Sequence, residues 1–184
     1  MHKPHSARRQ AGFTLVELLI VAIILAILAA IIIPQFASTT VDAQESALRA
    51  NVAGLRSAID LYRQQHGEYP GVSAASGGAC TGTAGTGAAG TQLAIQDQLT
   101  RYSNASGQTC SIPDAGYAYG PYLREDTLPA NPITGSSVVA IIAVGDLDMT
   151  ADGANLGWKF DTTAGKFIVN DTNLDSQGVA YSTY

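Results

Sequence analysis

The chain has 184 residues, of which 46% are hydrophobic, and it carries a formal charge of −5. This length accommodates one domain and an extended element, and much of the apolar sequence lies in the first fifth of the chain. Because phosphate recognition needs clustered lysine and arginine, the acidic balance argues against nucleic acid as a partner.

A short basic segment precedes the apolar sequence. Residues 1–12 contain Lys3, Arg8 and Arg9, which are three of the ten basic residues, and every acidic residue follows them. Without this leader the chain would carry a charge of about −8. The sign of the leader is the one expected of a cytoplasmic flank under the positive-inside rule.

The next segment is suited to a lipid bilayer. Residues 18–33 are apolar without interruption, and residues 13–16 extend the segment to about the 20 residues that a span needs. Glu17 is the exception, and a carboxylate in such a position is costly and usually functional. The rival interpretation is a secretory signal peptide cleaved at one of the alanines between positions 26 and 30. An acid inside the apolar region argues against it.

The sequence combines a Gly12-Phe13-Thr14 junction, a glutamate four residues after Phe13 and a proline, Pro34, at the end of the apolar run. At these residues the chain resembles the type IV pilin and type II secretion pseudopilin superfamily. The similarity is strong from Gly12 to about Tyr69 and weaker beyond. The resemblance implies that a prepilin peptidase of the inner membrane cuts after Gly12 and methylates the new amino terminus at Phe13. The matching residues are Gly12-Phe13-Thr14-Leu15-Val16-Glu17-Leu18-Leu19-Ile20-Val21, Ile27-Leu28-Ala29-Ala30 and Ile33-Pro34-Gln35-Phe36.

Glu17 and Pro34 are the candidate assembly residues, together with Phe13. Glu17 lies four residues after Phe13, so the two share a helix face. The resemblance implies that the Phe13 amine of one subunit pairs with Glu17 of its neighbour, which avoids an unpaired charge among apolar helices and favours one axial register. The alternative is a Glu17 that stays solvated at headgroup depth. Pro34 either ends the membrane segment or lets the helix bend during packing, and both remain open.

An amphipathic helix is predicted to continue from the apolar one to about residue 65. Glu45 and Arg49 have the spacing of a favourable i, i+4 pair on its surface. His66-Gly67 predicts the end of the helix, and Pro70 follows. Apolar residues at alternating steps of four and three form one face, namely Leu48, Val52, Leu55, Ile59 and Tyr62.

Residues 71–91 are a low-complexity run of Gly, Ala, Ser and Thr, which predicts an exposed loop that buries little. A short helix is predicted at residues 92–102, with Leu93 and Leu99 facing inward. Cys80 and Cys110, the only cysteines, lie on either side of this helix. In an exported domain their default state is one disulfide, and two cysteines without neighbouring histidines are too few for a zinc site.

Strand-like runs follow at residues 117–123, 138–144, 156–161 and 166–170, with a turn at residues 163–165. The run at 138–144 is apolar throughout, which predicts a central strand. Tyr117, Tyr119 and Tyr122 are expected to line one sheet face. The predicted fold is α+β and type IV pilin-like: a long N-terminal α-helix with a protruding apolar half and an amphipathic half packed on a small antiparallel β-sheet.

Asp146, Asp148 and Asp152 form an oxygen-rich loop with Gly153 and Asn155. Calcium favours several such ligands, although the spacing does not match an EF-hand. The resemblance to major pseudopilins, which bind calcium in an acidic loop near the C-terminus, adds support to a calcium site here. No other cofactor is predicted.

Three parts are expected along the chain. Residues 1–12 are a cleaved leader, residues 13–34 are a transmembrane and filament-core helix, and residues 35–184 are a periplasmic or extracellular globular domain that includes the amphipathic segment 35–65. The precursor is expected in the bacterial inner membrane with its N-terminus in the cytoplasm, and the processed chain in a periplasmic or cell-surface filament. Expected partners are further copies of the chain, the membrane, prepilin peptidase, an assembly platform and minor pilins.

The predicted function is structural rather than enzymatic, and two identities compete. The first, which the sequence favours, is a major pseudopilin of a type II secretion-like system. The segments that resemble it are Leu61-Tyr62, Tyr69-Pro70, Gly120-Pro121-Tyr122-Leu123 and Asn131-Pro132. The second is the major type IV pilin of a surface pilus used in adhesion, twitching or DNA uptake. Its disulfide usually lies nearer the C-terminus. A more remote alternative is a membrane-anchored periplasmic enzyme or binding module, for which the sequence offers no convergent acid, base or nucleophile.

Overall fold

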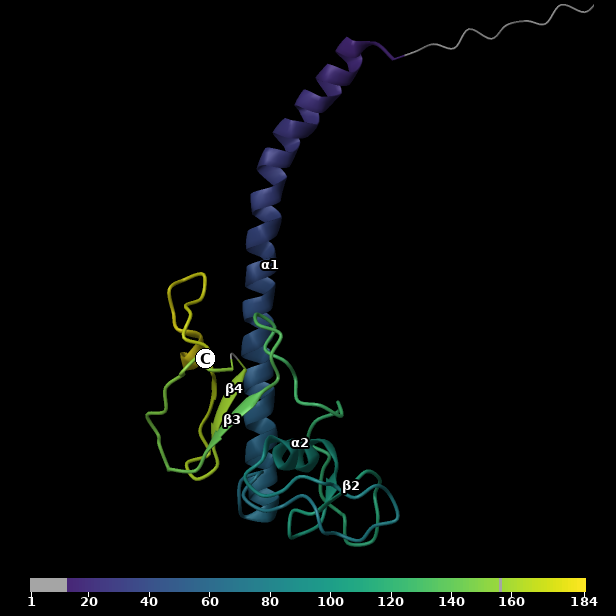
Figure 1. The fold of residues 1–184 in the computed structure, drawn as a ribbon, viewed down its shortest axis with the longest axis vertical. Helices are drawn as coiled ribbons and strands as arrows, with labels where there is room; N and C mark the ends of the chain where they lie inside the picture. The colour runs from purple at the N-terminus through teal and green to yellow at the C-terminus, as the bar shows by residue number, and fades with distance from the viewer. Residues whose placement is uncertain (1–12, 156) are drawn as a thin grey trace, which may run out of the picture. The chain divides into compact units, whose positions relative to one another are not determined.

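The computed structural model describes residues 13–155 and 157–184, apart from the side chains at positions 34, 37 and 38. The chain divides into two units, Met1–Val41 and Asp42–Tyr184, and helix α1 (Leu15–His66) contributes to both (Figure 1). The predicted leader, residues 1–12, lies outside the described residues. All other elements belong to the second unit.

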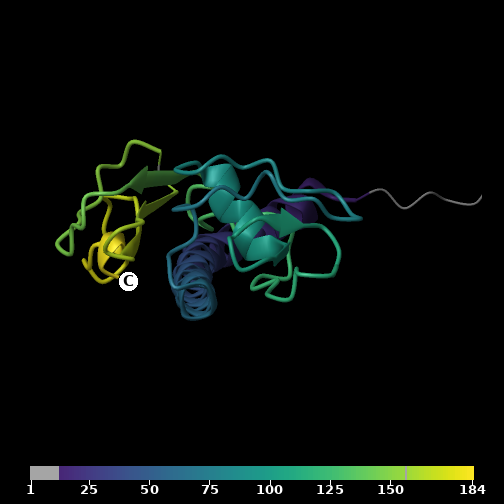
Figure 2. The same cartoon turned by 90° about the horizontal axis from the view of Figure 1, so that it is seen from below.

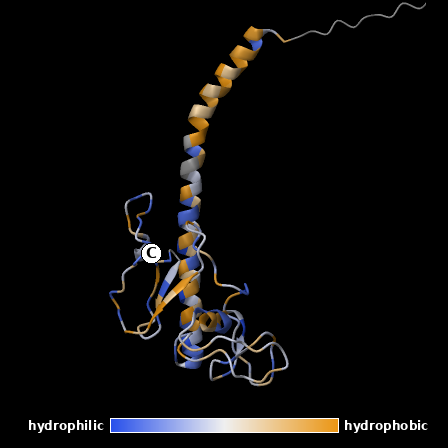
Figure 3. Cartoon of the chain, viewed as in Figure 1, coloured by the Kyte–Doolittle hydropathy of each residue, from blue (hydrophilic) through white to orange (hydrophobic). Residues whose placement is uncertain are grey.

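The first part of α1 is apolar on every face. The helix has 52 residues, and its backbone continues through position 34 without a break. Pro34 therefore does not end the helix, although a proline removes one backbone hydrogen bond from it. Figure 3 shows the nearly uniform apolar character of this part and the mixed character of the residues after it.

The second part of α1 carries the predicted amphipathic face, and this prediction is confirmed. Leu48, Val52, Leu55, Ile59 and Tyr62 are each at most 2% exposed. The helix ends at His66, as predicted, because Gly67 adopts a φ of +79° and its N–H donates to the Arg63 carbonyl at 2.8 Å. These five side chains form the α1 part of the hydrophobic core.

The largest sheet has three strands in the order β3 (Val139–Ile142), β4 (Trp158–Asp161) and β5 (Phe167–Val169). Trp158, Phe160, Phe167 and Val169 are at most 4% exposed and join the α1 face in one core. The predicted turn at residues 163–165 is present, and Asp161 Oδ1 accepts the N–H groups of Thr163 and Ala164 at 2.8 and 3.1 Å. The sheet therefore covers the amphipathic part of α1, as expected.

Two details of the predicted sheet are wrong. The sheet is mixed rather than antiparallel, since β3 pairs with β4 in parallel and only β4 and β5 are antiparallel. The long connection of residues 143–157 returns the chain to the same end of the sheet, which is what a parallel neighbour requires. In addition, β3 is an edge strand, and Val138 and Val144 beside it are 46% and 75% exposed. The central strand is β4.

A second group of elements lies beside the three-stranded sheet (Figure 2), and Gln92 Oε1 in this group accepts the Val139 N–H at 3.0 Å. It contains α2 (Gln92–Thr100) and a two-stranded antiparallel ladder of β1 (Tyr102–Ser103) and β2 (Thr109–Cys110). Thr91 caps α2 by accepting the Ala94 N–H at 3.2 Å. Leu99 is buried as predicted. Leu93 is 44% exposed, so the prediction that it faces inward is wrong.

The predicted strand at residues 117–123 does not form. Tyr117 and Tyr119 each make one isolated bridge, to Asp114 and Ser103. Gly120 then adopts a φ of +72° and Pro121 offers no N–H, so a ladder cannot continue. The three tyrosines consequently line no sheet face. Tyr119 and Tyr122 instead pack edge-on against His66 and Tyr62, with ring centroids 5.0 and 5.6 Å apart.

The Gly/Ala-rich run is more buried than its composition predicts. Its buried positions include Gly71, Ala75, Gly85 and Gly87. A β-carbon at Gly87 would lie 2.3 Å from the Ala94 nitrogen, so only glycine permits this approach to α2. Asp97 Oδ2 accepts the N–H groups of Thr86 and Gly87 at 3.0 and 3.1 Å. Hydrogen bonds from the backbone of this segment to a buried carboxylate hold it in place. A prediction based on the number of large apolar residues does not include such bonds and therefore expected an exposed loop.

Candidate functional site at the start of the apolar helix

Thr14 and Glu17 form a reciprocal cap at the start of α1. Glu17 Oε2 accepts the Thr14 N–H and the Thr14 hydroxyl, both at 2.9 Å, and the Thr14 hydroxyl accepts the Glu17 N–H at 3.2 Å. A threonine followed three residues later by a glutamate is the sequence pattern of a capping box. The carboxylate also lies at the positive end of the helix dipole. Glu17 therefore stabilises the helix start of its own chain.

The helix that follows this cap is exposed, and it carries no charge after Glu17. Residues Leu15–Ile33 have a mean hydropathy of 3.3, none of them is buried, and their length and composition suffice to cross a membrane. Glu17 is the only charged residue between positions 13 and 41. An isolated helix of this kind has to be covered by lipid or by other apolar helices.

The other sequence-predicted residues of this region are described only in part. Phe13 is 82% exposed and precedes the cap. Gly12 and the side chain of Pro34 lie outside the described residues. Cleavage after Gly12, methylation of Phe13 and the assembly roles of Phe13, Glu17 and Pro34 stay predictions.

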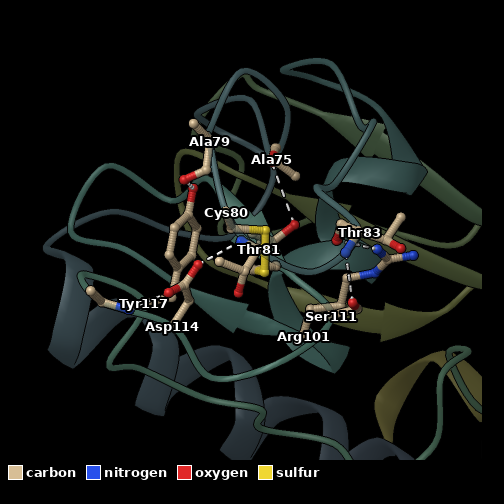
Figure 4. The surroundings of a disulfide bond; sticks show 12 residues. Ala75, Ala79, Cys80, Thr81, Thr83, Arg101, Ser111, Asp114 and Tyr117 are labelled. Carbon is tan, nitrogen blue, oxygen red and sulfur yellow. Dashed lines mark hydrogen bonds between the residues drawn. A yellow bond between two sulfur atoms is a disulfide. The ribbon is translucent and has the colours of Figure 1, made fainter.

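The predicted disulfide between Cys80 and Cys110 is present (Figure 4). It joins the Gly/Ala-rich run to β2, with a Cα–Cα distance of 6.2 Å across a separation of 30 residues. Asp114 Oδ2 accepts the Thr81 N–H at 2.6 Å, and this bond and the N–H of Ala115 lower the pKa of Asp114. The Asp114 carboxylate lies within 4.8 Å of both sulfur atoms. Because both sulfurs are in the disulfide, they supply no thiolate ligands to a metal.

The acidic loop does not bring its three predicted ligands into one cluster. In the described part of the chain, the group at Cys80, Cys110 and Asp114 alone combines three or more such side chains with ligand atoms within 4.8 Å. Asp152 pairs with Lys159 at 3.0 Å. Its pKa is lowered to about 2 by hydrogen bonds from the Ala154 N–H, the Asn170 amide and Lys159. Calcium at Asp146, Asp148 and Asp152 stays a prediction, and binding would require Lys159 to release Asp152.

A polar contact between α1 and the C-terminal segment was not anticipated. Glu45 is 3% exposed and accepts the Ser176 N–H at 2.7 Å and the Ser176 hydroxyl at 2.9 Å. Arg49 pairs with Asp175 at 3.1 Å instead of with Glu45, so the predicted i, i+4 pair does not form. The 3-10 helix η1 (Tyr181–Thr183) lies in the same segment. The spacing contained a signal, because Glu45 continues the buried face three residues before Leu48.

Comparison with known proteins gives matches to part of the sequence. Residues 7–33 match the family model described as the prokaryotic N-terminal methylation motif. The chain is 36% identical over 63 residues to the type II secretion system core protein G of Pseudomonas aeruginosa, covering 34% of this chain and 44% of that protein. It is 43% identical over 70 residues to the fimbrial protein of Neisseria meningitidis serogroup B, covering 38% and 41%.

The chain spans less than half the length of these curated relatives. No solved structure matches it significantly. The exposed apolar helix and its capped start coincide with the segment that the family model matches. The chain therefore carries the prokaryotic N-terminal methylation motif and is similar, over about a third of its length, to a type II secretion core protein and to a fimbrial protein.

Proposed function

We propose that this protein is a structural subunit of a helical, type IV pilus-like filament. The observation that carries the proposal is the exposed apolar helix Leu15–Ile33, which directly follows a capped start within the methylation motif. In the membrane, lipid covers this helix. In the filament, the same helices of neighbouring subunits cover one another, and close packing replaces the lipid contact.

Processing by prepilin peptidase precedes assembly in this proposal. Cleavage after Gly12 removes Lys3, Arg8 and Arg9, which hold the amino terminus of the precursor in the cytoplasm. The new Phe13 amine then pairs with Glu17 of a neighbouring subunit. Glu17 can make this pair while it still accepts the two hydrogen bonds from Thr14, because the two oxygens of a carboxylate offer about four acceptor sites.

The domain is exported to the periplasm or the cell surface, where the Cys80–Cys110 disulfide persists. An assembly platform and minor pilins act with this subunit. Similarity to the core protein of type II secretion supports a major pseudopilin as the primary identity.

Two measurements on filaments sheared from cells test the proposal. We expect mass spectrometry to find N-methylated Phe13 as the first residue, and electron microscopy to find the chain in filaments. Gly12→Val should leave an uncleaved precursor in the membrane and no filaments, since it replaces the glycine after which the cut is proposed. A processed chain that begins at another residue, or that remains monomeric in cells, contradicts the proposal.

A surface pilus is the second candidate, and the fimbrial relative with its higher identity of 43% favours it. The two candidates differ in filament length and in the consequence of losing the gene. Loss of protein secretion with intact surface pili indicates the pseudopilin, and loss of long surface filaments with normal secretion indicates the pilin. An activity that survives without assembly would point to the remote alternative of a membrane-anchored enzyme or binding module.

A further inference from the structure

A cleft in the unit Asp42–Tyr184 combines an apolar floor with a cationic rim. The cleft has a volume of about 270 Å³ and lies between α1 and the turn that precedes β5. Ile59 and Phe167, both at most 4% exposed, form its floor. Arg56, Asp60 and Lys166 form its polar rim.

The rim concentrates positive charge in a domain that is otherwise acidic. Residues 42–184 contain fourteen acidic and seven basic residues. Two of the seven line the cleft, and a third, Arg63, stacks over the Tyr69 ring at 4.2 Å. Tyr69 lies against Gly165 at the cleft wall, because a β-carbon there would fall within 1.9 Å of the ring. Three basic side chains against Asp60 make this region suited to an anionic occupant.

The loop after β3 has the complementary character. Val144 and Leu147 are 75% and 70% exposed, the highest values among the large apolar side chains described in residues 42–184. The exposed carboxylates of Asp146 and Asp148 flank Leu147. Leu147 is therefore complementary to the apolar floor of the cleft, and the two flanking carboxylates are complementary in charge to its cationic rim.

The same chain cannot supply this occupant from its present conformation. Lys166 Nζ donates to the Leu147 carbonyl, so the backbone of the loop lies at the edge of the cleft in its own chain. The Leu147 side chain nevertheless remains largely exposed and does not fill the cleft. A second copy of the chain carries the same loop and is available wherever the protein polymerises.

We propose that residues 144–148 of one copy dock into the Arg56–Lys166 cleft of a neighbouring copy, with Leu147 over Ile59 and Phe167 and with Asp148 beside Lys166. The proposal rests on the proposed filament function and names a contact between the globular domains. The loop and the cleft are different surfaces, so the contact is heterologous. Such a contact repeats without closing and thereby generates an open polymer.

Cysteine cross-linking tests the contact in the assembled protein. The described residues contain no free cysteine, so Leu147→Cys and Asp60→Cys each introduce a single thiol. We co-express the two full-length variants, shear the filaments and oxidise them. A covalent dimer that joins positions 147 and 60 is expected. In the control, Leu93→Cys replaces Leu147→Cys, because Leu93 is another exposed leucine. The dimer between positions 147 and 60 should be at least tenfold more abundant than the dimer between positions 93 and 60. Equal yields overturn the proposal.

Charge exchange tests the same contact without cross-linking. Asp148→Lys should reduce sheared filament at least threefold, and Lys166→Glu in the same chain should restore it to within a factor of two. Glu125→Lys, at an exposed acid elsewhere, serves as the control and should have no effect. An unaffected Asp148→Lys variant, or a loss that Lys166→Glu does not restore, overturns the contact. Absence of wild-type filaments would instead contradict the proposed function.

Discussion

Arg49 on α1 and Asp175 near the C-terminus form an ion pair in which Arg49 Nη2 lies 3.1 Å from Asp175 Oδ2. Tyr184 completes the arrangement, since its hydroxyl donates to Asp175 Oδ2 at 2.6 Å and its ring lies 4.3 Å below the Arg49 guanidinium. Together with the bonds from Ser176 to Glu45, this pair attaches residues 175–184 to the helix. Charged and polar contacts therefore hold the C-terminal segment in addition to the buried Tyr181.

The Arg49–Asp175 pair should make stability depend on pH. The Tyr184 hydroxyl and the Val179 N–H hold the pKa of Asp175 below its usual value. The contribution of ionised Asp175 to the free energy of unfolding is therefore complete above the pKa of about 3.9 that an aspartate has in the unfolded chain. This contribution is lost as the pH falls through the lower pKa of Asp175 in the folded protein. Asp175→Asn should lower the melting temperature at pH 7, and the difference from wild type should shrink below about pH 4. Glu125→Gln, an exposed control, should show no such convergence, and a pH-independent deficit in Asp175→Asn would contradict the mechanism.

Thr14→Ala and Glu17→Gln should separate capping from charge pairing at the start of α1. Glutamine can still accept the Thr14 bonds of the capping box but carries no charge, whereas Thr14→Ala removes the cap and keeps the charge. If the Phe13 amine pairs with Glu17, Glu17→Gln should abolish filament incorporation. Thr14→Ala should cost about 1 kcal/mol of helix stability and leave most incorporation intact. The amount of each variant in sheared filaments is the measurement. Equal defects would assign Glu17 to capping alone.

Leu55→Ala should strongly destabilise the domain. Leu55 is 2% exposed in the core between α1 and the sheet, and truncating such a leucine costs about 2 to 5 kcal/mol through lost burial and a residual cavity. Leu61→Ala, at a position on the same helix that is 45% exposed, is the matched control. Denaturant unfolding of the two detergent-solubilised variants gives the comparison, and similar midpoints would place Leu55 outside the core.

Reduction of the Cys80–Cys110 disulfide should loosen the Gly/Ala-rich run. Closing a loop of 30 residues is worth about 3 to 4 kcal/mol in the chain-entropy model. The double variant Cys80→Ser with Cys110→Ser should melt at a lower temperature than wild type, and a reductant should lower the wild-type melting temperature but leave the variant unchanged. Limited proteolysis should then cut residues 71–91 first.

Calcium binding by the acidic loop has a direct test. A calcium ion held by Asp146, Asp148 and Asp152 would have to displace Lys159 from Asp152. Because an ion that binds only the folded state stabilises that state, calcium should raise the melting temperature, and a chelator should reverse the rise. Asp148→Asn should remove the effect, with Glu125→Gln as the control. Calorimetry that detects no heat of calcium binding would eliminate this site.

Local patterns were sufficient for the helical part of this protein. The four-three spacing from Leu48 to Tyr62 identified the buried face, because residues at that spacing share one side of any α-helix. Gly67 marked the helix end for a similarly local reason, since glycine readily adopts the left-handed conformation there. The two cysteines allowed only one intramolecular pairing. The capping box of Thr14 and Glu17 was equally available as a four-residue pattern.

Contacts between distant segments decided what the sequence left open. An apolar run at residues 138–144 is compatible with a central or an edge strand, and its parallel pairing with Trp158–Asp161 depends on the path of the intervening loop. Arg49 had two acidic partners within reach of its flexible side chain, and the fold brought Asp175 to it. The glycine-rich run became buried because the Asp97 side chain and the backbone of Thr109 supplied hydrogen bonds to it. The sequence by itself determined the elements with a helical period, and the tertiary structure decided strand order, charge pairing and loop burial because these depend on long-range packing.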